Sequence, residues 1–187
     1  MKFISNLAIM FLFVGIMSGC STHQTIADLT AKAEQGDADA QFNLGYNYAN
    51  GEGGATHDDE QAVYWYTKAA QQGHGMAQNN LGFMYGLRYK NYEQALYWFT
   101  KGAEQGNAEA QSNLAATYYN GQGVSKDYNQ AFYWATKSAE QGSLSGQYYL
   151  AKMYHYGRGV KQDEKKASYW RNKVVKRGYL DPYLFED

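Results

Sequence analysis

Residues 62–85 have the sequence AVYWYTKAAQQGHGMAQNNLGFMY, and this stretch decides the fold. From Ala62 onward, apolar residues recur at the spacing i, i+3, i+4, i+7, which places them on one face of a helix. From Ala77 onward, small or apolar residues lie four positions apart and also share one face. Gly73 stands between the two segments and can adopt the positive φ that ends a helix and turns the chain. The stretch therefore predicts two helices joined by a turn.

The pattern of this stretch occurs four times along the chain. The tryptophans mark it with spacings of 33, 36 and 36 residues, at Trp65, Trp98, Trp134 and Trp170. Glycines close successive units at Gly36, Gly73, Gly106, Gly142 and Gly178. Each unit is predicted to be a hairpin of two helices, which cannot bury its apolar stripe until neighbouring hairpins stack on it. The sequence thus predicts an all-α fold, an α-solenoid of four helical hairpins.

The first helix of each unit carries Ala-Gln or Gly-Gln, then Leu-Gly or Leu-Ala, then Tyr, and in three units a Gly-x-Gly turn follows. Over residues 37–178 this pattern resembles the Sel-1-like repeats (SLR), relatives of the tetratricopeptide repeats. The resemblance implies a right-handed superhelix with repeats at residues 37–73, 74–106, 107–142 and 143–178. Residues 20–36 are expected to hold an N-terminal capping helix, in which Ile26, Leu29 and Ala33 pack on the first repeat. Residues 179–187 are expected to form a short C-terminal cap.

The second repeat departs from this pattern. It has 33 residues, and the segment Gly86-Leu87-Arg88-Tyr89-Lys90 stands where the other repeats have Gly-x-Gly. We expect the changed connection to bend the solenoid locally. The alternative is a loop that differs without any functional consequence.

The N-terminal segment predicts export and lipid anchoring. Residues 1–19 contain a lysine followed by an apolar run, as in a secretory signal, and the run is shorter than the roughly 20 residues that cross a bilayer. The segment Met17-Ser18-Gly19-Cys20 resembles the lipobox of bacterial lipoproteins, which implies that Cys20 becomes the acylated N-terminus. Since Ser21 rather than Asp follows it, the resemblance further implies the periplasmic face of the outer membrane. The alternative is an ordinary cleaved signal that leaves Cys20, the only cysteine, as a free or buried thiol.

Composition and motifs argue against nucleic-acid binding and against catalysis. Lys and Arg total 17 and Asp and Glu total 18, so the chain has no basic surplus for nucleic acid. The four histidines show no metal-ligand spacing, and we interpret His23, His57 and His74 as solvated loop residues. The acidic run at residues 58–60 is expected to favour the start of a helix. The sequence therefore predicts no catalytic residues, no metal and no cofactor, and a protein that is not an enzyme.

The register of the first helices predicts a protein-binding groove. In the tetratricopeptide-like architecture these helices line the concave face, and core positions at Leu44, Gly45 and Tyr48 leave other side chains pointing into the groove. The predicted binding residues are Phe42, Tyr46, Asn50, Asn79, Phe83, Leu87, Ser112, Tyr119, Asn120, Tyr148, Lys152, His155 and Tyr156. They predict a groove of aromatic and amide side chains with little net charge. The alternative is that some of the tyrosines pack between helices, as we expect for Tyr48 and Tyr118.

Three functions are compatible with these features. The first, which the resemblance favours, is a lipid-anchored periplasmic adaptor or scaffold that binds another protein at its concave face. The second is an immunity protein that neutralises a secreted phospholipase-type effector in the periplasm, as some exported SLR lipoproteins do. The third is a cell-wall protein that binds or hydrolyses peptidoglycan or β-lactams. The SLR proteins described as acting on β-lactams are cysteine-rich, whereas this chain has one cysteine.

Overall fold

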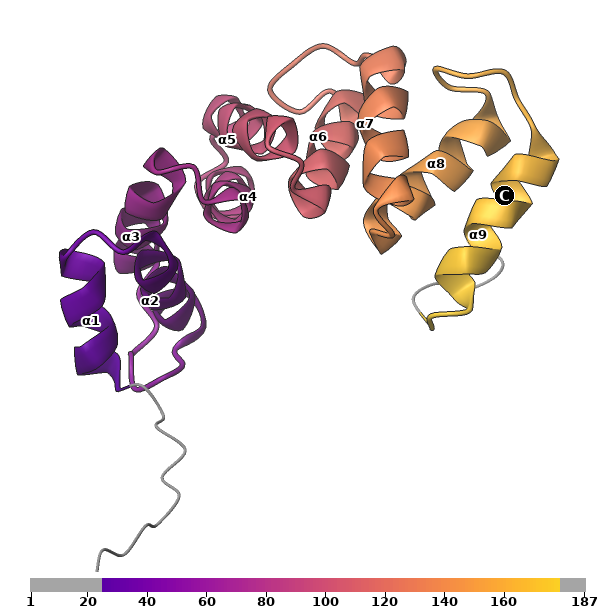
Figure 1. Cartoon of the computed structure of the whole chain (residues 1–187). Helices are drawn as coiled ribbons and strands as arrows, with labels where there is room; N and C mark the ends of the chain where they lie inside the picture. Colours follow the sequence, from indigo (N-terminus) through magenta and orange to yellow (C-terminus); the bar gives the residue numbers. More distant parts are fainter. Residues whose placement is uncertain (1–24, 179–187) are drawn as a thin grey trace, which may run out of the picture.

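The computed structural model describes residues 25–178, and its elements there are all helices. The predicted signal at residues 1–19, the predicted lipidation site Cys20 and the predicted C-terminal cap at residues 179–187 lie outside the described residues. In chain order the elements are α1 (Ile26–Glu34), α2 (Ala38–Asn50), α3 (Asp59–Gln71), α4 (Gly75–Phe83), the π-helix η1 (Met84–Arg88), α5 (Tyr92–Glu104), α6 (Ala108–Asn120), α7 (Tyr128–Glu140), α8 (Leu144–Tyr156) and α9 (Glu164–Val175). They form a curved row of helical hairpins (Figure 1), which confirms the α-solenoid.

Each repeat pairs a first helix with a second helix: α2 with α3, α4 and η1 with α5, α6 with α7, and α8 with α9. Helix α1 packs on α2 at the N-terminal end of the row. Its residues Leu29 and Ala33 are buried in one cluster with Ala40, Leu44 and Trp65. The expected capping helix is therefore present and closes the apolar face that the first hairpin would otherwise leave open.

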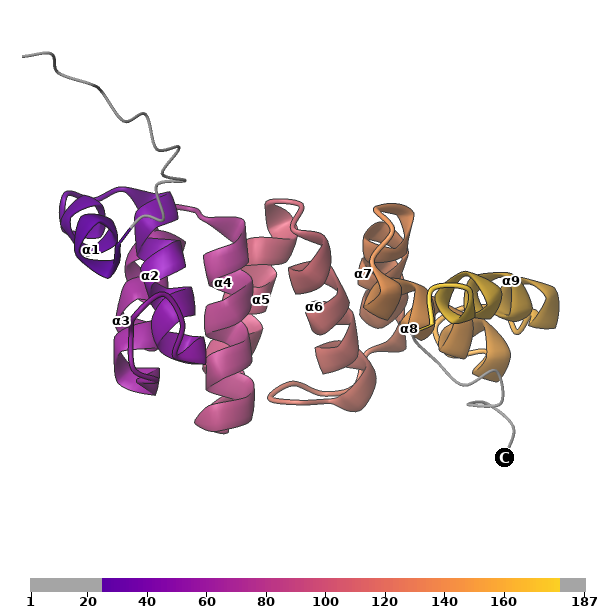
Figure 2. The ribbon, with the colours of Figure 1, turned by 90° about the horizontal axis from the view of Figure 1, so that it is seen from below.

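The first helices form the inner side of the arc. Helix α4 contacts α6, and α6 contacts α8. Within the described residues no comparable contact joins the second helices α5, α7 and α9 to one another. Because α4, α6 and α8 touch while α5, α7 and α9 spread apart, this part of the row curves towards the first helices. Figure 2 views the arc from below, on this inner side.

Small residues in the first helices allow the two helices of a hairpin to approach closely. A Cβ on Gly45 would lie 2.8 Å from Cδ1 of Tyr66, and a Cβ on Gly82 would lie 2.7 Å from Cδ1 of Phe99. Contacts that short are repulsive, so these two rings can pack on the first helix only because a glycine faces them. The Leu-Gly pairs of the sequence thus mark where the second helix meets the first.

Buried glutamines connect successive repeats. Gln41 donates to the Ala33 carbonyl at 2.9 Å and accepts from Gln72 at 2.8 Å. The same pair of bonds recurs in repeats two and three through Gln78 with Gln105 and Gln111 with Gln141. In repeat four Arg177 stands where the second glutamine would be, and Oε1 of the buried Gln147 finds no hydrogen-bond donor among the described residues. An unsatisfied buried acceptor is costly, but Arg177 still donates to the Gly142 carbonyl at 3.3 Å, as Gln72 does to the Gly36 carbonyl.

Polar side chains satisfy the first N–H groups of the helices. Asp58 accepts two backbone hydrogen bonds at the start of α3, as expected for the acidic run at residues 58–60. The interpretation of His74 as a solvated loop residue is wrong. Its Nδ1 accepts from the backbone N–H of Ala77 at 3.2 Å, and its ring stacks on Phe42 with centroids 4.6 Å apart. His74 caps α4 because a neutral imidazole nitrogen is also an acceptor.

Candidate functional site

Two cavities open on the inner face, and Phe83 lies between them. The central cavity, of about 260 Å³, is lined by Phe83, Gly86, Leu87, Lys90, Tyr92, Ala95, Phe99, Asn113, Ala116, Thr117 and Gln122. The N-terminal cavity, of about 250 Å³, is lined by Tyr46, Ala49, Asn50, Tyr66, Asn80, Phe83, Met84 and Arg88. The Phe83 side chain is 51% exposed and borders both cavities, so it joins them into one surface.

The connection of repeat two forms part of the wall of the central cavity. In the other repeats the first helix ends at a glycine in the left-handed conformation, namely Gly51, Gly121 and Gly157. In repeat two the helix widens into η1 and continues to Arg88, and Lys90 then adopts a φ of 54°. This extension places Leu87 and Lys90 in the cavity wall. π-Helices are rare and are frequently found at functional sites.

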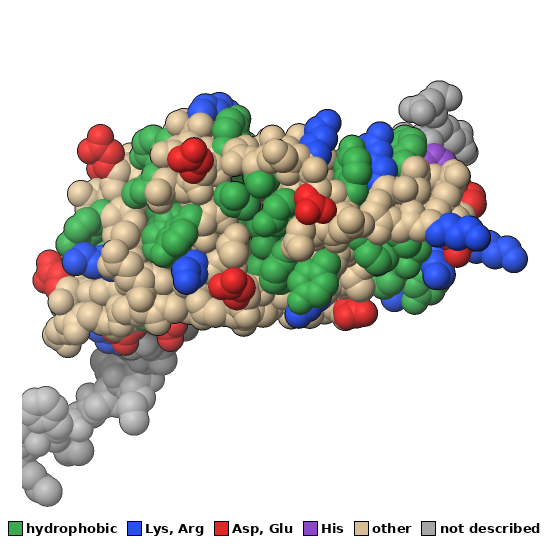
Figure 3. Space-filling model, turned by 90° about the horizontal axis from the view of Figure 1, so that it is seen from above, with side chains coloured by type: hydrophobic (Ala, Val, Ile, Leu, Met, Phe, Trp, Pro, Cys, Tyr) green, Lys and Arg blue, Asp and Glu red, His purple; other side chains and the backbone are tan. Residues whose placement is uncertain are grey.

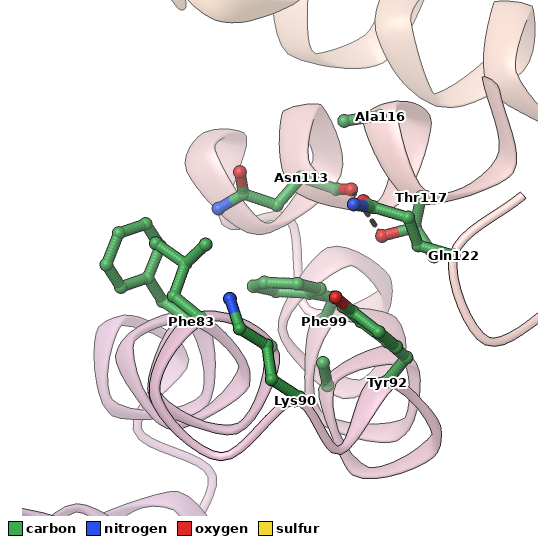
Figure 4. A pocket seen from close by; sticks show the side chains of 11 residues that line it. Phe83, Lys90, Tyr92, Phe99, Asn113, Ala116, Thr117 and Gln122 are labelled. Atoms are coloured by element: carbon green, nitrogen blue, oxygen red, sulfur yellow. Dashed lines mark hydrogen bonds between the residues drawn. The ribbon is translucent and has the colours of Figure 1, made fainter. Parts of the chain in front are cut away.

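Figure 4 shows how the side chains of the central cavity are arranged. The amine of Lys90 points into the space between the rings of Phe83 and Phe99. Helix α6 provides the opposite wall, where the Thr117 hydroxyl donates to the Asn113 carbonyl at 2.8 Å. The cavity therefore combines aromatic walls with a few positioned polar groups, which is the usual composition of a ligand-binding pocket.

Each cavity has one cation in its wall. Arg88 lines the N-terminal cavity and Lys90 lines the central one, and no Asp or Glu is among the described residues that line either cavity. Arg88 lies 3.8 Å from a carboxylate oxygen of Asp59, and Lys90 makes no ion pair within residues 25–178. Both cations come from the connection of repeat two and not from the helix register.

A second group of side chains gathers where α6 and α8 meet. We call it the Tyr–cation cluster, and it consists of Tyr119, Tyr128, Tyr148, Lys152, Tyr156 and Arg158. The Arg158 guanidinium donates to the Tyr119 hydroxyl and lies 4.9 Å from the centroid of the Tyr156 ring. The Lys152 amine lies 5.2 Å from the Tyr119 ring and 5.8 Å from the Tyr148 ring. These cation–π contacts hold both cations over the rings.

Tyr119 and Tyr148 do not neutralise the cations of this cluster near pH 7. Burial raises the pKa of the Tyr119 hydroxyl, although the neighbouring Arg158 guanidinium acts in the opposite direction. Burial also raises the pKa of the Tyr148 hydroxyl. Both hydroxyls therefore stay protonated and neutral near pH 7, and neither compensates the positive charge of Lys152 and Arg158.

The structure brings most of the predicted binding residues to these two places. Those that line the cavities are Tyr46, Asn50, Phe83 and Leu87. Asn79 lies beside them and accepts a hydrogen bond from Asn113 at 2.9 Å. Those in or next to the Tyr–cation cluster are Asn120, Tyr148, Lys152, His155 and Tyr156. His155 also contacts the Glu164 carboxylate at 2.8 Å. Partner binding by these residues stays a prediction.

Three of the predicted binding residues are placed differently from the prediction. Ser112 is 1% exposed and Tyr119 is 4% exposed, so neither offers surface to a partner. Phe42 is half-buried and stacks on His74, and it therefore packs between repeats one and two. The register was insufficient here because the neighbouring hairpin and the Arg158 turn cover positions that a single helix would leave open.

The sequence prediction missed the cations that the connections contribute. Arg158 stands at the centre of the Gly-x-Gly turn of repeat four, where repeats one and three have Glu52 and Gln122. This change of charge at one turn position was the sequence signal from which the cation could have been predicted. That the turn folds back over Tyr119 depends on tertiary contacts. Lys90 was missed because its segment was interpreted only as a changed loop.

Within residues 25–178, no three His, Cys, Asp or Glu side chains are grouped so that they could hold a metal ion. Of the histidines interpreted as loop residues, His57 is exposed and lies 3.3 Å from Asp59, and His23 lies outside the described residues. None of the helices in the described range is both long enough and apolar enough to cross a membrane.

Comparisons with known proteins agree with this architecture. The Sel1 repeat family model matches residues 38–74, 75–107, 108–143 and 144–172. No curated protein matches the chain. Among solved structures, the chain is similar to a protective antigen present in uropathogenic Escherichia coli strains that displays an SLR fold. The identity is 37% and the TM-score 0.76, over 82% of this chain and 33% of that one.

Two further solved structures are similar. A Sel1 repeat protein from Oxalobacter formigenes has 36% identity and a TM-score of 0.76, over 82% of this chain and 62% of that one. Cysteine rich protein B of Helicobacter pylori has 22% identity and a TM-score of 0.54, over 67% of this chain and 92% of that one, and this likeness shows the fold alone. The chain thus spans a third of the E. coli protein and less than two thirds of the Oxalobacter protein. Because the family model matches four consecutive segments that together cover most of the sequence, the chain belongs to the Sel1 repeat family.

Proposed function

We propose that this protein is a scaffold that binds another protein through the inner face of its solenoid. The Sel1 repeat scaffold is suited to protein binding. The observation that supports the inner face is the exposure of large apolar side chains at its cavities, where Phe83 is 51% and Leu87 is 52% exposed. Large apolar side chains beside a pocket are typical anchors of protein interfaces, and burying them in a complex is favourable.

Site-specific photocross-linking tests this proposal. A photoreactive phenylalanine analogue replaces Phe83 on the inner face or, as a control, Tyr133 on the outer helix α7, which is similarly exposed at 47%. Irradiation of the host cells is expected to produce one dominant adduct from position 83 and none of comparable yield from position 133. Equal yields from both positions, or adducts from position 133 only, would show that the inner face is not the binding surface.

We also propose that the scaffold is held at the periplasmic face of the outer membrane through a lipid on Cys20. The support is the resemblance of residues 17–20 to a lipobox. In the chain, Cys20 precedes the capping helix α1, which begins at Ile26, so the lipid would hold the repeats close to the membrane surface. Growth of the host with an alkyne fatty acid is expected to label the wild-type protein in the outer-membrane fraction. The Cys20→Ser variant is expected to stay unlabelled; equal labelling of the two contradicts the anchor.

The adaptor, immunity and cell-wall functions differ in what binds the inner face. We propose the adaptor function, because exposed apolar side chains and cavities on a curved repeat scaffold suit a protein partner. Identification of the molecule cross-linked at position 83 separates the three. An envelope protein supports the adaptor, a secreted phospholipase supports the immunity protein, and a muropeptide supports the cell-wall protein.

A further inference from the structure

The inner face changes in character from one end of the row to the other. One register position, two residues after the buried leucine of each first helix, is occupied by Tyr46, Phe83, Ala116 and Lys152 in repeats one to four. The first two of these residues line the cavities described above, and Lys152 belongs to the Tyr–cation cluster. The same surface therefore begins with aromatic side chains and ends with a cation.

Three cations on this face have no carboxylate partner. Within residues 25–178, Lys90, Lys152 and Arg158 take part in none of the ion pairs. Nearby carboxylates contact other basic side chains: Asp59 contacts Arg88 and His57, Glu164 contacts His155, and Asp39 contacts His74. These three unpaired cations occur in a chain whose formal net charge is −1, so they reflect the placement of side chains and not the composition.

The cations of the Tyr–cation cluster are positioned to receive an acidic group. Lys152 and Arg158 are half-buried, and each lies over the Tyr119 ring, 5.2 Å from its centroid. Arg158 uses its guanidinium for one hydrogen bond, to the Tyr119 hydroxyl, and a guanidinium has five N–H donors. The remaining donors are held in a fixed orientation by the rings, which favours a bidentate bond with a carboxylate.

The central cavity and the Tyr–cation cluster are within reach of one extended peptide. The cavity is lined by α4, η1, α5 and α6, and the cluster lies between α6 and α8. Helix α4 contacts α6, and α6 contacts α8. Helices in contact lie about 8–10 Å apart. An extended chain advances about 3.3 Å per residue, so roughly five or six residues span the distance from α4 to α8. A flat anionic membrane cannot follow the concave inner side of the arc and is a poorer fit.

We infer that the inner face binds an acidic segment of a partner protein, with an apolar side chain in the central cavity and carboxylates at Lys152 and Arg158. Lys90, in the cavity wall, adds a third positive charge along the same path. This inference rests on the proposed function and specifies the chemistry of the partner. The apolar anchor provides contact area, while the carboxylates fix the direction and register of the bound segment.

Selection from a peptide library tests this inference without knowledge of the partner. The full chain carrying Cys20→Ser is immobilised and exposed to random linear peptides of about 12 residues, which are long enough to span both sites. The selected peptides are expected to be enriched in Asp and Glu next to a large apolar residue. The affinity of the strongest peptide is expected to fall as the salt concentration rises.

A matched pair of double variants then locates the acidic contact. Lys152→Gln with Arg158→Gln removes two cations from the inner face. Lys137→Gln with Lys173→Gln removes two from the outer helices α7 and α9, where each lysine also lies over a tyrosine ring, at 5.0 Å and 4.8 Å. The inner pair is expected to weaken binding of the selected peptide about tenfold or more, and the outer pair by less than about twofold. Circular dichroism and the melting temperature check that both variants fold, and Lys152→Gln alone serves if the double variant does not.

The outcomes separate failure of this inference from failure of the proposed function. Selected peptides without an acidic excess, whose binding is still lost in Phe83→Ala, would overturn the inference and leave inner-face protein binding in place. Equal loss in the inner and outer variants would also overturn it, since the effect would then come from net charge. Failure to select any peptide, together with no cross-linked adduct from position 83, contradicts both this inference and the proposed function.

Discussion

Repeats two and three build the same hairpin but connect its helices differently. In repeat three, α6 ends at Gly121 in the left-handed conformation, and an irregular loop leads to α7. In repeat two, α4 widens into η1, and the turn occurs at Lys90. Both repeats nevertheless bury a leucine at the same position, Leu81 and Leu114. The core pattern is therefore sufficient for the hairpin, and the connection is free to shape the inner surface.

The two connections also differ in how well their residues suit the backbone. Glycine adopts a positive φ at little cost, and it does so at Gly121 and Gly123. Lys90 has a φ of 54°, where a Cβ is unfavourable by about 1–2 kcal/mol. This backbone conformation occurs where the lysine amine lies in the central cavity. Residues in costly conformations concentrate at functional sites, which supports a role for the Lys90 side chain itself.

The largest expected effect tests whether the equivalent buried leucine stabilises both hairpins to a similar extent. Leu81→Ala and Leu114→Ala are each expected to lower the free energy of unfolding by about 2–5 kcal/mol, because each leaves a cavity at a fully buried site. Chemical denaturation followed by circular dichroism measures both. A large loss in one repeat and a negligible loss in the other would show that the connection, and not the shared core, holds one of the hairpins together.

The second effect concerns binding at the inner face. Phe83→Ala is expected to weaken binding of the cross-linked partner by about 2 kcal/mol or more while changing stability by less than about 0.5 kcal/mol, because Phe83 is half in solvent. Tyr148→Ala is expected to lower both binding and stability, since Tyr148 is half-buried and packs edge-on against Tyr149 at 5.3 Å. Titration calorimetry and thermal melting measure the two quantities, with Tyr133→Ala on the outer face as the control. Unfolding of the Phe83 variant would place that side chain in the core.

A matched pair of glycine substitutions tests the difference between the connections directly. Gly121→Ala is expected to lower stability by about 1–2 kcal/mol, because φ is +72° and a Cβ would lie 2.8 Å from Lys126. Gly86→Ala is expected to be neutral or slightly stabilising, because Gly86 lies inside η1 and its Cβ would lie 3.4 Å from the Ala95 Cβ. Equal losses in the free energy of unfolding of the two variants, measured by urea denaturation, would contradict the π-helical connection of repeat two.

The smallest expected effect concerns Lys90. Lys90→Gly is expected to raise stability by less than about 1 kcal/mol, because glycine tolerates the positive φ but loses more conformational entropy on folding. The same substitution is expected to weaken binding of an acidic peptide. Lys90→Gln, which keeps a side chain and removes the charge, separates the two contributions. A loss of stability in Lys90→Gly would mean that contacts of the lysine stem outweigh the backbone strain.

The outer face offers a further contrast with the inner one. Each second helix exposes a tyrosine at the same repeat position, namely Tyr64, Tyr97, Tyr133 and Tyr169, and a lysine four residues later lies over each ring at 4.8–5.8 Å. Figure 3 views the outer face from above and shows separate hydrophobic patches with charged side chains between them. Local pairs of this kind need no partner to explain them, because each lysine covers part of its own tyrosine. This regularity makes the outer face a suitable control surface for the experiments above.

Much of the fold could be predicted because its signals are local. The spacing of Trp65 and Trp98 gave the repeat length, and the closing glycines such as Gly73 gave the turns, because helix periodicity and positive φ are properties of short segments. Leu29 and Ala33 were correctly predicted to pack on the first repeat, since they continue the same apolar stripe. On the inner face, the same periodicity correctly placed Phe83 at a cavity.

The rest of the inner face depends on contacts between segments that are distant in the chain. Tyr119 and Lys152 were predicted from one register, yet Tyr119 is buried because the Arg158 turn folds back over it, 39 residues later in the chain. His74 caps α4, and its ring stacks on Phe42 of repeat one, 32 positions earlier in the chain. Helical spacing specifies which side of a helix a residue is on, whereas the exposure and charge of that side depend on which neighbouring hairpin or turn covers it. The local spacing of residues thus determines the hairpins and their number, whereas the stacking of the hairpins determines the binding surface.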